Sequence, residues 1–193
     1  MTIRSARVTD APSAARLMYA ALRNVATLLT GATEEPEILS LLEHFFSLPS
    51  NRLSYQQALV KELDQRIVGL ILLYGGDEAE KLDLPLLERL RALHQDPQMT
   101  FPKEANDDEY YIDTLSVSPE YGGRGIGTEL IAAAEERARQ HGYIKMSLLV
   151  DLTNPRASRL YERLGYHTDK QIQIGPDLYE HKVKVLSSDL YSR

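Results

Sequence analysis

A glycine-rich loop in the middle of the chain carries the clearest chemical signal. The stretch from Tyr110 to Gly127 reads as a strand, a turn through Ser118-Pro119-Glu120, and a loop that enters a helix. Four residues of the loop are glycines: Gly122, Gly123, Gly125 and Gly127. Glycine lets the backbone approach a ligand closely, and a helix start adds unpaired N–H groups and the positive end of the helix dipole. The junction therefore predicts an anion site, with a phosphate as the expected guest.

Two common phosphate-binding patterns fit this loop poorly. A nucleotide-binding P-loop ends in Gly-Lys-Ser/Thr, whereas Gly127 is followed by Thr128-Glu129, so the lysine is missing. A dinucleotide-binding pattern starting at Gly123 would place Thr128 where it needs Gly or Ala. Asp151, after the next strand, could imitate the ribose-binding acid of that pattern. The dinucleotide pattern nevertheless belongs in a doubly wound parallel sheet, and the strands before this loop look antiparallel.

A second motif in a later helix changes the interpretation of the loop. The two segments read V-S-P-E-Y-G-G-R-G-I-G-T-E-L and N-P-R-A-S-R-L-Y-E-R-L-G-Y. Together they resemble the GNAT superfamily of acyl-CoA-dependent N-acetyltransferases, whose loop reads Gln/Arg-x-x-Gly-x-Gly/Ala. The loop matches at Gly125 and Gly127, and Gly122 stands where the family usually has Gln or Arg. The family's helix pattern matches at Asn154, Ala157, Leu160, Tyr161, Gly165 and Tyr166.

The resemblance implies that an acetyl group passes directly from acetyl-CoA, as cosubstrate, to a primary amine. The residue types agree with a direct transfer. Because the chain has no Cys and no Gly-x-Ser-x-Gly motif, a covalent acyl-enzyme has no obvious nucleophile. Direct transfer needs a pyrophosphate cradle, a donor for the developing oxyanion, and proton handling at both ends.

By the same likeness, the cofactor lies along one strand and the loop that follows it. The implied pyrophosphate cradle consists of Gly122, Gly123, Arg124, Gly125, Ile126, Gly127 and Thr128. Arg124 either adds a phosphate contact or faces solvent. The strand ending at Val117 is expected to splay from Ile144 to Val150, so that free backbone groups of Leu115 and Val117 pair with the pantetheine arm. The Val117 N–H is the implied oxyanion donor, and Asn154 is expected to cap its helix and also to contact the cofactor arm.

Tyr161 is the implied acid that protonates the departing thiolate. Taken alone, a tyrosine on the apolar stripe of a helix more often only packs. The base is open: Asp113, just before the splayed section, is the first candidate and Glu109 the second, and either could act through a water or be a solvated acid. The five histidines show no metal-ligand spacing, so no metal site is expected.

The predicted strands and helices follow one another along the chain in the order that this family shows. The predicted helices run from Thr9 or Asp10 to Leu28, from Pro36 to Pro49, from Gly127 to His141, and between Asn154 and Gly165. The predicted strands are Thr2 to Val8, Ser54 to Leu63, Arg66 to Tyr74, Tyr110 to Val117, Ile144 to Val150, Tyr166 to Ile174 and Leu178 to Leu186. The strand from Arg66 to Tyr74 is apolar almost throughout, so we expect both of its faces to be covered.

The segment 77–108 differs in composition from the rest of the chain. It carries nine acidic and four basic residues, a charge of −5 out of −6 for the whole chain, around a short leucine-rich helix. Its first interpretation is a solvated insertion into the minimal family fold. The alternative is a lid over the substrate, whose acidity favours a cationic amine.

The bulk composition excludes several classes of protein. A content of 43% hydrophobic and 26% charged residues is ordinary for a globular protein. The net charge of −6 argues against nucleic acid as a partner, since phosphate neutralisation needs a basic surface. The N-terminus is too polar for a signal peptide, and the longest apolar run, Ile67 to Tyr74, is too short to cross a bilayer. These features predict a cytoplasmic protein with no membrane partner.

We therefore expect one domain over residues 1–193, with an acidic insertion at about 77–108. The expected fold is α/β (α+β): a mixed, mostly antiparallel sheet flanked by helices, with the cofactor between two parallel strands. The acceptor amine, on a small molecule or a protein, stays open, and the resemblance makes a homodimer possible. The rival hypothesis is a non-catalytic acyl-CoA-binding or regulatory module, in which Tyr161 only packs.

Overall fold

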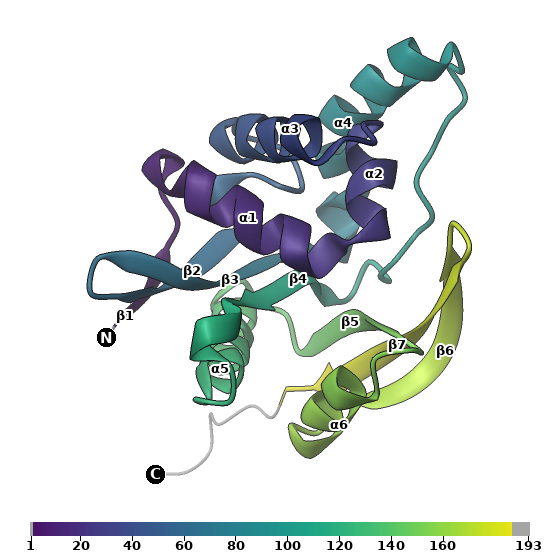
Figure 1. Cartoon of the computed structure of the whole chain (residues 1–193). Helices are drawn as coiled ribbons and strands as arrows, with labels where there is room; N and C mark the ends of the chain where they lie inside the picture. The colour runs from purple at the N-terminus through teal and green to yellow at the C-terminus, as the bar shows by residue number, and fades with distance from the viewer. Residues whose placement is uncertain (1, 187–193) are drawn as a thin grey trace, which may run out of the picture.

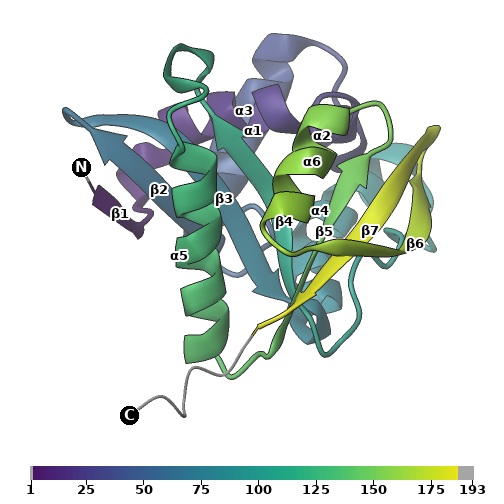
Figure 2. The same cartoon turned by 90° about the horizontal axis from the view of Figure 1, so that it is seen from below.

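The computed structural model describes residues 2–186. In these residues, seven β-strands form one sheet. Their order across the sheet is β1-β2-β3-β4-β5-β7-β6 (Figures 1 and 2). The strands are β1 (Thr2–Ser5), β2 (Ala58–Leu63), β3 (Arg66–Gly75), β4 (Tyr110–Val117), β5 (Lys145–Asp151), β6 (His167–Ile174) and β7 (Asp177–Val185). All neighbouring pairs are antiparallel except β4 and β5, which run parallel. The predicted mixed, mostly antiparallel sheet is confirmed.

Helices cover both faces of this sheet. They are α1 (Ala11–Leu22), α2 (Asn24–Thr30), α3 (Glu35–Ser47), α4 (Ala79–His94), α5 (Ile126–Gln140) and α6 (Pro155–Arg163). Figure 1 shows α1 to α4 on one side of the sheet and α5 and α6 on the other. In β3, Leu70 and Leu72 pack on the α1–α3 side while Ile71 and Leu73 pack on the α5 side. This two-sided burial explains why β3 is apolar at consecutive positions and confirms the expectation for that strand.

Three predicted elements differ from the structure in their bounds. The expected helix to Leu28 is broken at Arg23, whose φ of 51° and ψ of −118° separate α1 from α2. The expected strand to Val8 ends at Ser5, because the Asp10 carboxylate accepts the Arg7 N–H and closes a short turn. The strand expected from Ser54 begins only at Ala58, because the Ser54 side chain caps a turn of 3₁₀-helix. The other predicted elements outside segment 77–108 are present with ends shifted by at most two residues.

The parallel strands β4 and β5 separate along their length, and this divergence shapes the candidate site. They pair only from Tyr110–Met146 to Ile112–Leu148. Beyond that point β4 keeps its pairing with β3, and β5 keeps its pairing with β7. The two strands therefore leave an opening at their carboxyl ends, the direction in which β4 leads into α5 and β5 into α6 (Figure 2).

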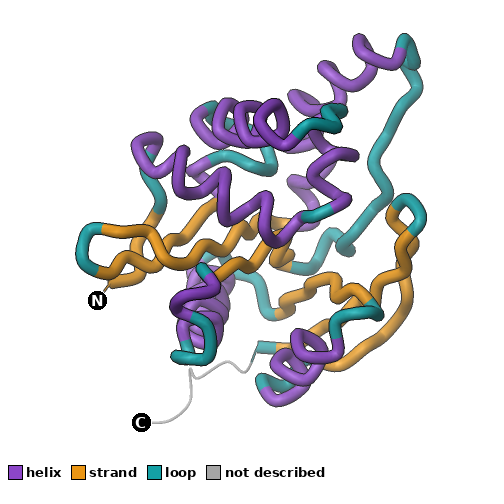
Figure 3. The backbone as a smooth tube through the Cα atoms, in the orientation of Figure 1, coloured by secondary structure: helices purple, strands orange, loops and turns teal. Residues whose placement is uncertain are grey.

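The segment 77–108 adds α4 and a long connection to β4. Four leucines of α4 are buried: Leu82, Leu86, Leu87 and Leu90. In the tube view of Figure 3 the connection runs down from α4 and passes the β6–β7 hairpin, where Lys170 donates to the Asn106 side chain at 3.1 Å. Within residues 2–186, no helix combines the length and apolarity needed to cross a bilayer.

Candidate active site

A cleft of about 370 Å³ opens where β4 and β5 diverge. Its wall is formed by β4 and β5, the α1–α2 corner, the start and inner face of α6, the β6–β7 hairpin, and the side chains of Arg52 and Glu104. The lining residues include the predicted site residues Asp113, Leu115, Asn154 and Tyr161. Segments far apart in the sequence thus meet in one hollow. Val117, the last residue of β4, and the glycine loop that follows are outside the lining of this cleft.

The edge of β4 that faces the cleft carries unused backbone groups. The N–H of Ser118 donates to Val68 O on the β3 side at 2.8 Å. Because N–H groups alternate in direction along a strand, those of Leu115 and Val117 point to the opposite side, where β5 has turned away. An extended ligand laid along this edge would find free hydrogen-bonding groups.

The glycine loop leads from β4 into α5 and leaves open space at two positions. Gly123 and Gly125 have φ of +74° and +81°, and a Cβ added at either would meet nothing within 4 Å. Gly125 directly precedes α5, whose first N–H groups have no intrahelical partner. A Cβ at Gly122 would lie 3.2 Å from Pro119 O, so a larger residue there needs the turn to yield. The geometry suits an anion held by backbone N–H groups.

Arg124 does not reach toward this open space. Its guanidinium lies over the Tyr121 ring, 5.2 Å from the ring centroid, and donates to Glu120 O at 3.3 Å. Its side chain therefore packs back onto the turn before the loop. Of its two expected roles, this geometry matches the solvent-facing arginine better than a phosphate ligand.

Tyr161 presents a protonated phenol to the cleft. Its side chain is buried and packs edge-to-face on Tyr166, with ring centroids 5.8 Å apart. Burial raises the pKa of the Tyr161 phenol well above its usual range, and no group within residues 2–186 hydrogen-bonds to its hydroxyl. The helix that carries it starts as predicted, because Asn154 Oδ1 accepts the Ala157 N–H at 3.1 Å. A neutral hydroxyl without a protein partner suits a proton donor.

Asp113 is poorly placed to act as a base. Its carboxylate is 2% exposed and lies 2.6 Å from the Arg52 guanidinium. It also accepts hydrogen bonds from the hydroxyls of Tyr74, at 2.6 Å, and Thr114, at 2.8 Å. Both carboxylate oxygens are therefore already engaged, and a water or an amine would have to displace one of these donors to reach them. The alternative that Asp113 is a solvated acid is wrong, because its side chain is buried against Arg52.

Glu109, the second candidate base, is buried outside the cleft. It accepts hydrogen bonds from the N–H and side-chain amide of Asn106, at 2.9 and 2.6 Å, and pairs with Lys145 at 3.3 Å. Burial alone would raise the pKa of Glu109, but hydrogen bonds from His181 and Asn106 hold it well below its usual range. This carboxylate therefore anchors the start of β4.

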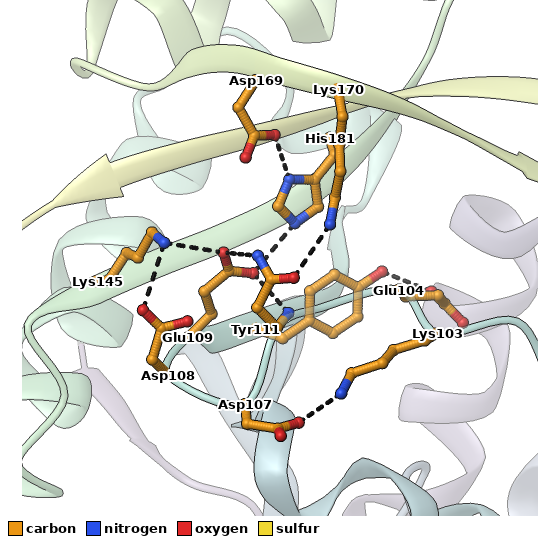
Figure 4. A network of polar contacts seen from close by, with 11 residues as sticks. Lys103, Glu104, Asp107, Asp108, Glu109, Tyr111, Lys145, Asp169, Lys170 and His181 are labelled. Carbon is orange, nitrogen blue, oxygen red and sulfur yellow. Dashed lines mark hydrogen bonds and ion pairs between the residues drawn. The ribbon is translucent and has the colours of Figure 1, made fainter.

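Glu109, Asp169 and His181 form a cluster whose composition resembles a metal site. His181 Nδ1 lies 2.5 Å from Asp169 Oδ1, and Nε2 lies 3.1 Å from Glu109 Oε2 (Figure 4). Burial lowers the pKa of His181, but its two carboxylate partners raise it above the usual value overall. A ring with a carboxylate at each nitrogen is an imidazolium, which has no lone pair for a metal. We interpret the cluster as an ion-pair network that ties β6 and β7 to β4.

The acidic segment 77–108 is not simply a solvated insertion. Asp83 and Glu104 turn inward to the buried guanidinium of Arg52, and Glu104 lines the cleft. Arg52, a lone arginine in a loop, was missed by the sequence analysis because no motif or spacing marks it. Its only sequence signal is its place after Pro49 and before a predicted strand.

Comparison with known proteins agrees with this arrangement. Residues 22–166 match the model of the acetyltransferase (GNAT) family. An acetyltransferase of Yersinia pestis is 28% identical over 109 residues, covering 49% of this chain and 75% of that protein. The crystal structure of an N-acetyltransferase from Staphylococcus aureus Mu50 has a TM-score of 0.80 and 28% identity, covering 95% of this chain and 100% of that one. Another acetyltransferase crystal structure has a TM-score of 0.79 and 29% identity, covering 97% of this chain and all of that one.

Proposed function

Since the chain belongs to the acetyltransferase (GNAT) family, we propose that it transfers an acetyl group from acetyl-CoA to a primary amine by direct attack on the thioester. The observation that carries the proposal is the divergence of β4 and β5 after Ile112–Leu148. It leaves a free strand edge and the Tyr161 hydroxyl on one cleft. The mostly antiparallel sheet and the family match argue against the dinucleotide alternative, and relatives named acetyltransferases favour an enzyme over a binding module.

The residues around the loop fit such a cosubstrate. The pyrophosphate would lie at the start of α5, in the open space beside Gly123 and Gly125. The N–H groups from Gly122 to Thr128 would be its hydrogen-bond donors. Leu115 and Val117 would pair with the pantetheine arm through the free edge of β4. Asn154 lines the cleft beside that path and would add a polar contact. When bound, acetyl-CoA supplies the activated acetyl thioester and the leaving thiolate.

The chain's own groups then handle charge and protons. The Val117 N–H, on the free side of β4, would stabilise the negative charge that develops on the thioester oxygen. Tyr161 would donate its proton to the departing sulfur, because burial keeps its phenol protonated. Asp113 and Glu109 already hold ion-pair and hydrogen-bond partners, so we assign neither as the base. The acceptor would react from its neutral fraction.

The experiment that tests this function is acetyl transfer to a panel of amines. The panel contains 1,4-diaminobutane, L-lysine and a short peptide with a free N-terminus. Because the chain has no Cys, a thiol reagent reports only the CoA that is released. Amine-dependent CoA release, with an acetylated product identified by mass spectrometry, is the expected result. Acetyl-CoA binding without any acetylated product across a wide amine panel would argue for the binding-module alternative.

A further inference from the structure

Arg52 is a buried arginine that a tight loop holds in place. Its side chain is 4% exposed, and its backbone N–H donates to Leu82 O in α4 at 3.1 Å. The preceding Asn51, fully buried, donates to Phe45 O at 2.9 Å and accepts the Leu53 N–H at 2.9 Å. The guanidinium is therefore presented from a loop that these hydrogen bonds hold against α3 and α4.

The guanidinium joins three carboxylates from three different segments. It contacts Asp113 on β4 through Nε at 2.9 Å and Nη2 at 2.6 Å. It contacts Glu104, in the connection after α4, through Nη2 at 2.8 Å, and Asp83, in α4, through Nη1 at 3.2 Å. All three guanidinium nitrogens are used. We call Arg52 with these three carboxylates the Arg52 network.

Two buried tyrosines fix the orientation of this network. The Tyr74 hydroxyl donates to Asp113 and the Tyr111 hydroxyl donates to Glu104, both at 2.6 Å. Their rings pack edge-to-face with centroids 5.7 Å apart. Figure 4 shows the Tyr111–Glu104 contact. Because Asp113 and Glu104 each have both a charged and a neutral donor, neither of these two carboxylates can turn without leaving a buried group unpaired.

The Arg52 network separates the cleft from a second cavity of about 230 Å³. Arg52, Glu104 and Tyr111 line both hollows, whereas Asp113 lines only the cleft and Asp83 only the second cavity. Asp83 and Glu104 belong to segment 77–108, and Asp113 belongs to the diverging strand β4. Arg52 thus attaches that segment to the strand that carries the proposed oxyanion donor.

We propose that Arg52 is a positioning residue for acetyl transfer. It holds Glu104 and Asp113 on the lining of the cleft, and fixes segment 77–108 as the wall against which we place the acceptor amine. The role rests on the proposed function. A planar guanidinium can satisfy three carboxylates at fixed angles, which a lysine ammonium cannot reproduce. Because Arg52 makes no hydrogen bond or ion pair with Tyr161 or the glycine loop within residues 2–186, acetyl-CoA binding should not depend on it.

The test compares Arg52→Lys with wild type in three measurements: calorimetry with acetyl-CoA, steady-state kinetics with the best acceptor of the amine panel above, and hydrogen exchange of segment 77–108. Arg52→Lys should raise the acceptor KM about tenfold or more, change kcat less than the KM, and speed exchange in that segment. Its acetyl-CoA affinity should stay within about twofold of wild type. Glu104→Gln, which keeps the Arg52–Asp113 pair, should raise the same KM.

A matched control separates positioning from a general loss of structure. Arg4→Lys changes another arginine that pairs with two carboxylates, Asp10 and Glu62, away from the cleft, and it should leave the acceptor KM unchanged. An unchanged acceptor KM or unchanged exchange in Arg52→Lys would overturn the role of Arg52. So would a parallel loss of acetyl-CoA affinity. A wild-type protein that does not bind acetyl-CoA would instead overturn the proposed function itself.

Discussion

Replacing Tyr161 by Phe removes one hydroxyl and leaves the ring in place. Since no group within residues 2–186 hydrogen-bonds to that hydroxyl, and the ring keeps its edge-to-face contact with Tyr166, the fold loses little. We expect the free energy of unfolding to change by less than about 0.5 kcal/mol. Acetyl-CoA affinity should also stay within about twofold, because the proposed cofactor contacts on β4, the glycine loop and Asn154 are unchanged.

The effect on turnover should be large. A positioned general acid contributes about 10²- to 10⁴-fold to a rate. At about 1.36 kcal/mol per tenfold change in rate, this corresponds to about 2.7–5.4 kcal/mol of transition-state stabilisation. The loss should fall on kcat, because the hydroxyl acts as the thiolate departs and not when the substrates bind. The assay is CoA release followed with a thiol reagent, for a panel of accepted amines.

Tyr166→Phe provides the matched control within the same motif. The Tyr166 hydroxyl donates to Glu135 at 3.3 Å and does not line the cleft. Its loss should lower stability by about 1 kcal/mol and spare turnover. Unchanged kcat in Tyr161→Phe across the amine panel, or equal losses in both variants, would refute the assignment of Tyr161 as the acid.

Three further changes probe other parts of the account. Gly125→Ala, at φ of +81° in the loop, should weaken acetyl-CoA binding at least tenfold in calorimetry, whereas Gly142→Ala, at φ of +83°, should cost similar backbone strain and leave affinity unchanged. The raised pKa of His181 means that its ion pairs stabilise the fold fully below pH 6.5 and are lost as the pH rises through the folded-state value. The free energy of unfolding, measured by denaturation at pH 6 and at higher pH, should therefore fall as the pH rises. In His181→Gln this fall should be shallower, and an equal fall in both proteins would contradict the assignment. Arg23→Gly should relieve about 1–3 kcal/mol of strain, against about 0.5–1 kcal/mol of added unfolded-state entropy; a lower melting temperature would contradict that balance.

Local chemistry made much of the fold predictable. Asn154 before a proline marks a helix start by cap chemistry alone, and the structure has that cap. Asp64-Gln65 between two apolar runs marks a tight connection, and both residues adopt positive φ there. The glycine loop and the Tyr161 motif could be identified from the sequence because each depends on residue types at fixed spacing.

The rest depends on contacts between distant segments, which spacing does not encode. Apolar residues continue at helical spacing through Arg23, so only the backbone reveals the break between α1 and α2. The acids of segment 77–108 look alike in sequence, yet Glu104 turns inward because it forms an ion pair with the buried Arg52. Asp113 is adjacent to the splayed section as expected, but its partner lies 61 residues earlier in the chain. The Arg52–Asp113 pair could not be inferred from sequence spacing, so it did not enter the choice of base.

The most direct test of the central claim is the thermal stability of the protein with acetyl-CoA, CoA, NAD and ATP in parallel. At a ligand concentration 100-fold above its dissociation constant, binding stabilises the folded state by about 2.7 kcal/mol. For a chain of this size, that corresponds to a rise of about 5–10 °C in the melting temperature. Acetyl-CoA and CoA should produce this shift and NAD should not. A shift with NAD alone, or none with acetyl-CoA and CoA at saturating concentration, would contradict the account.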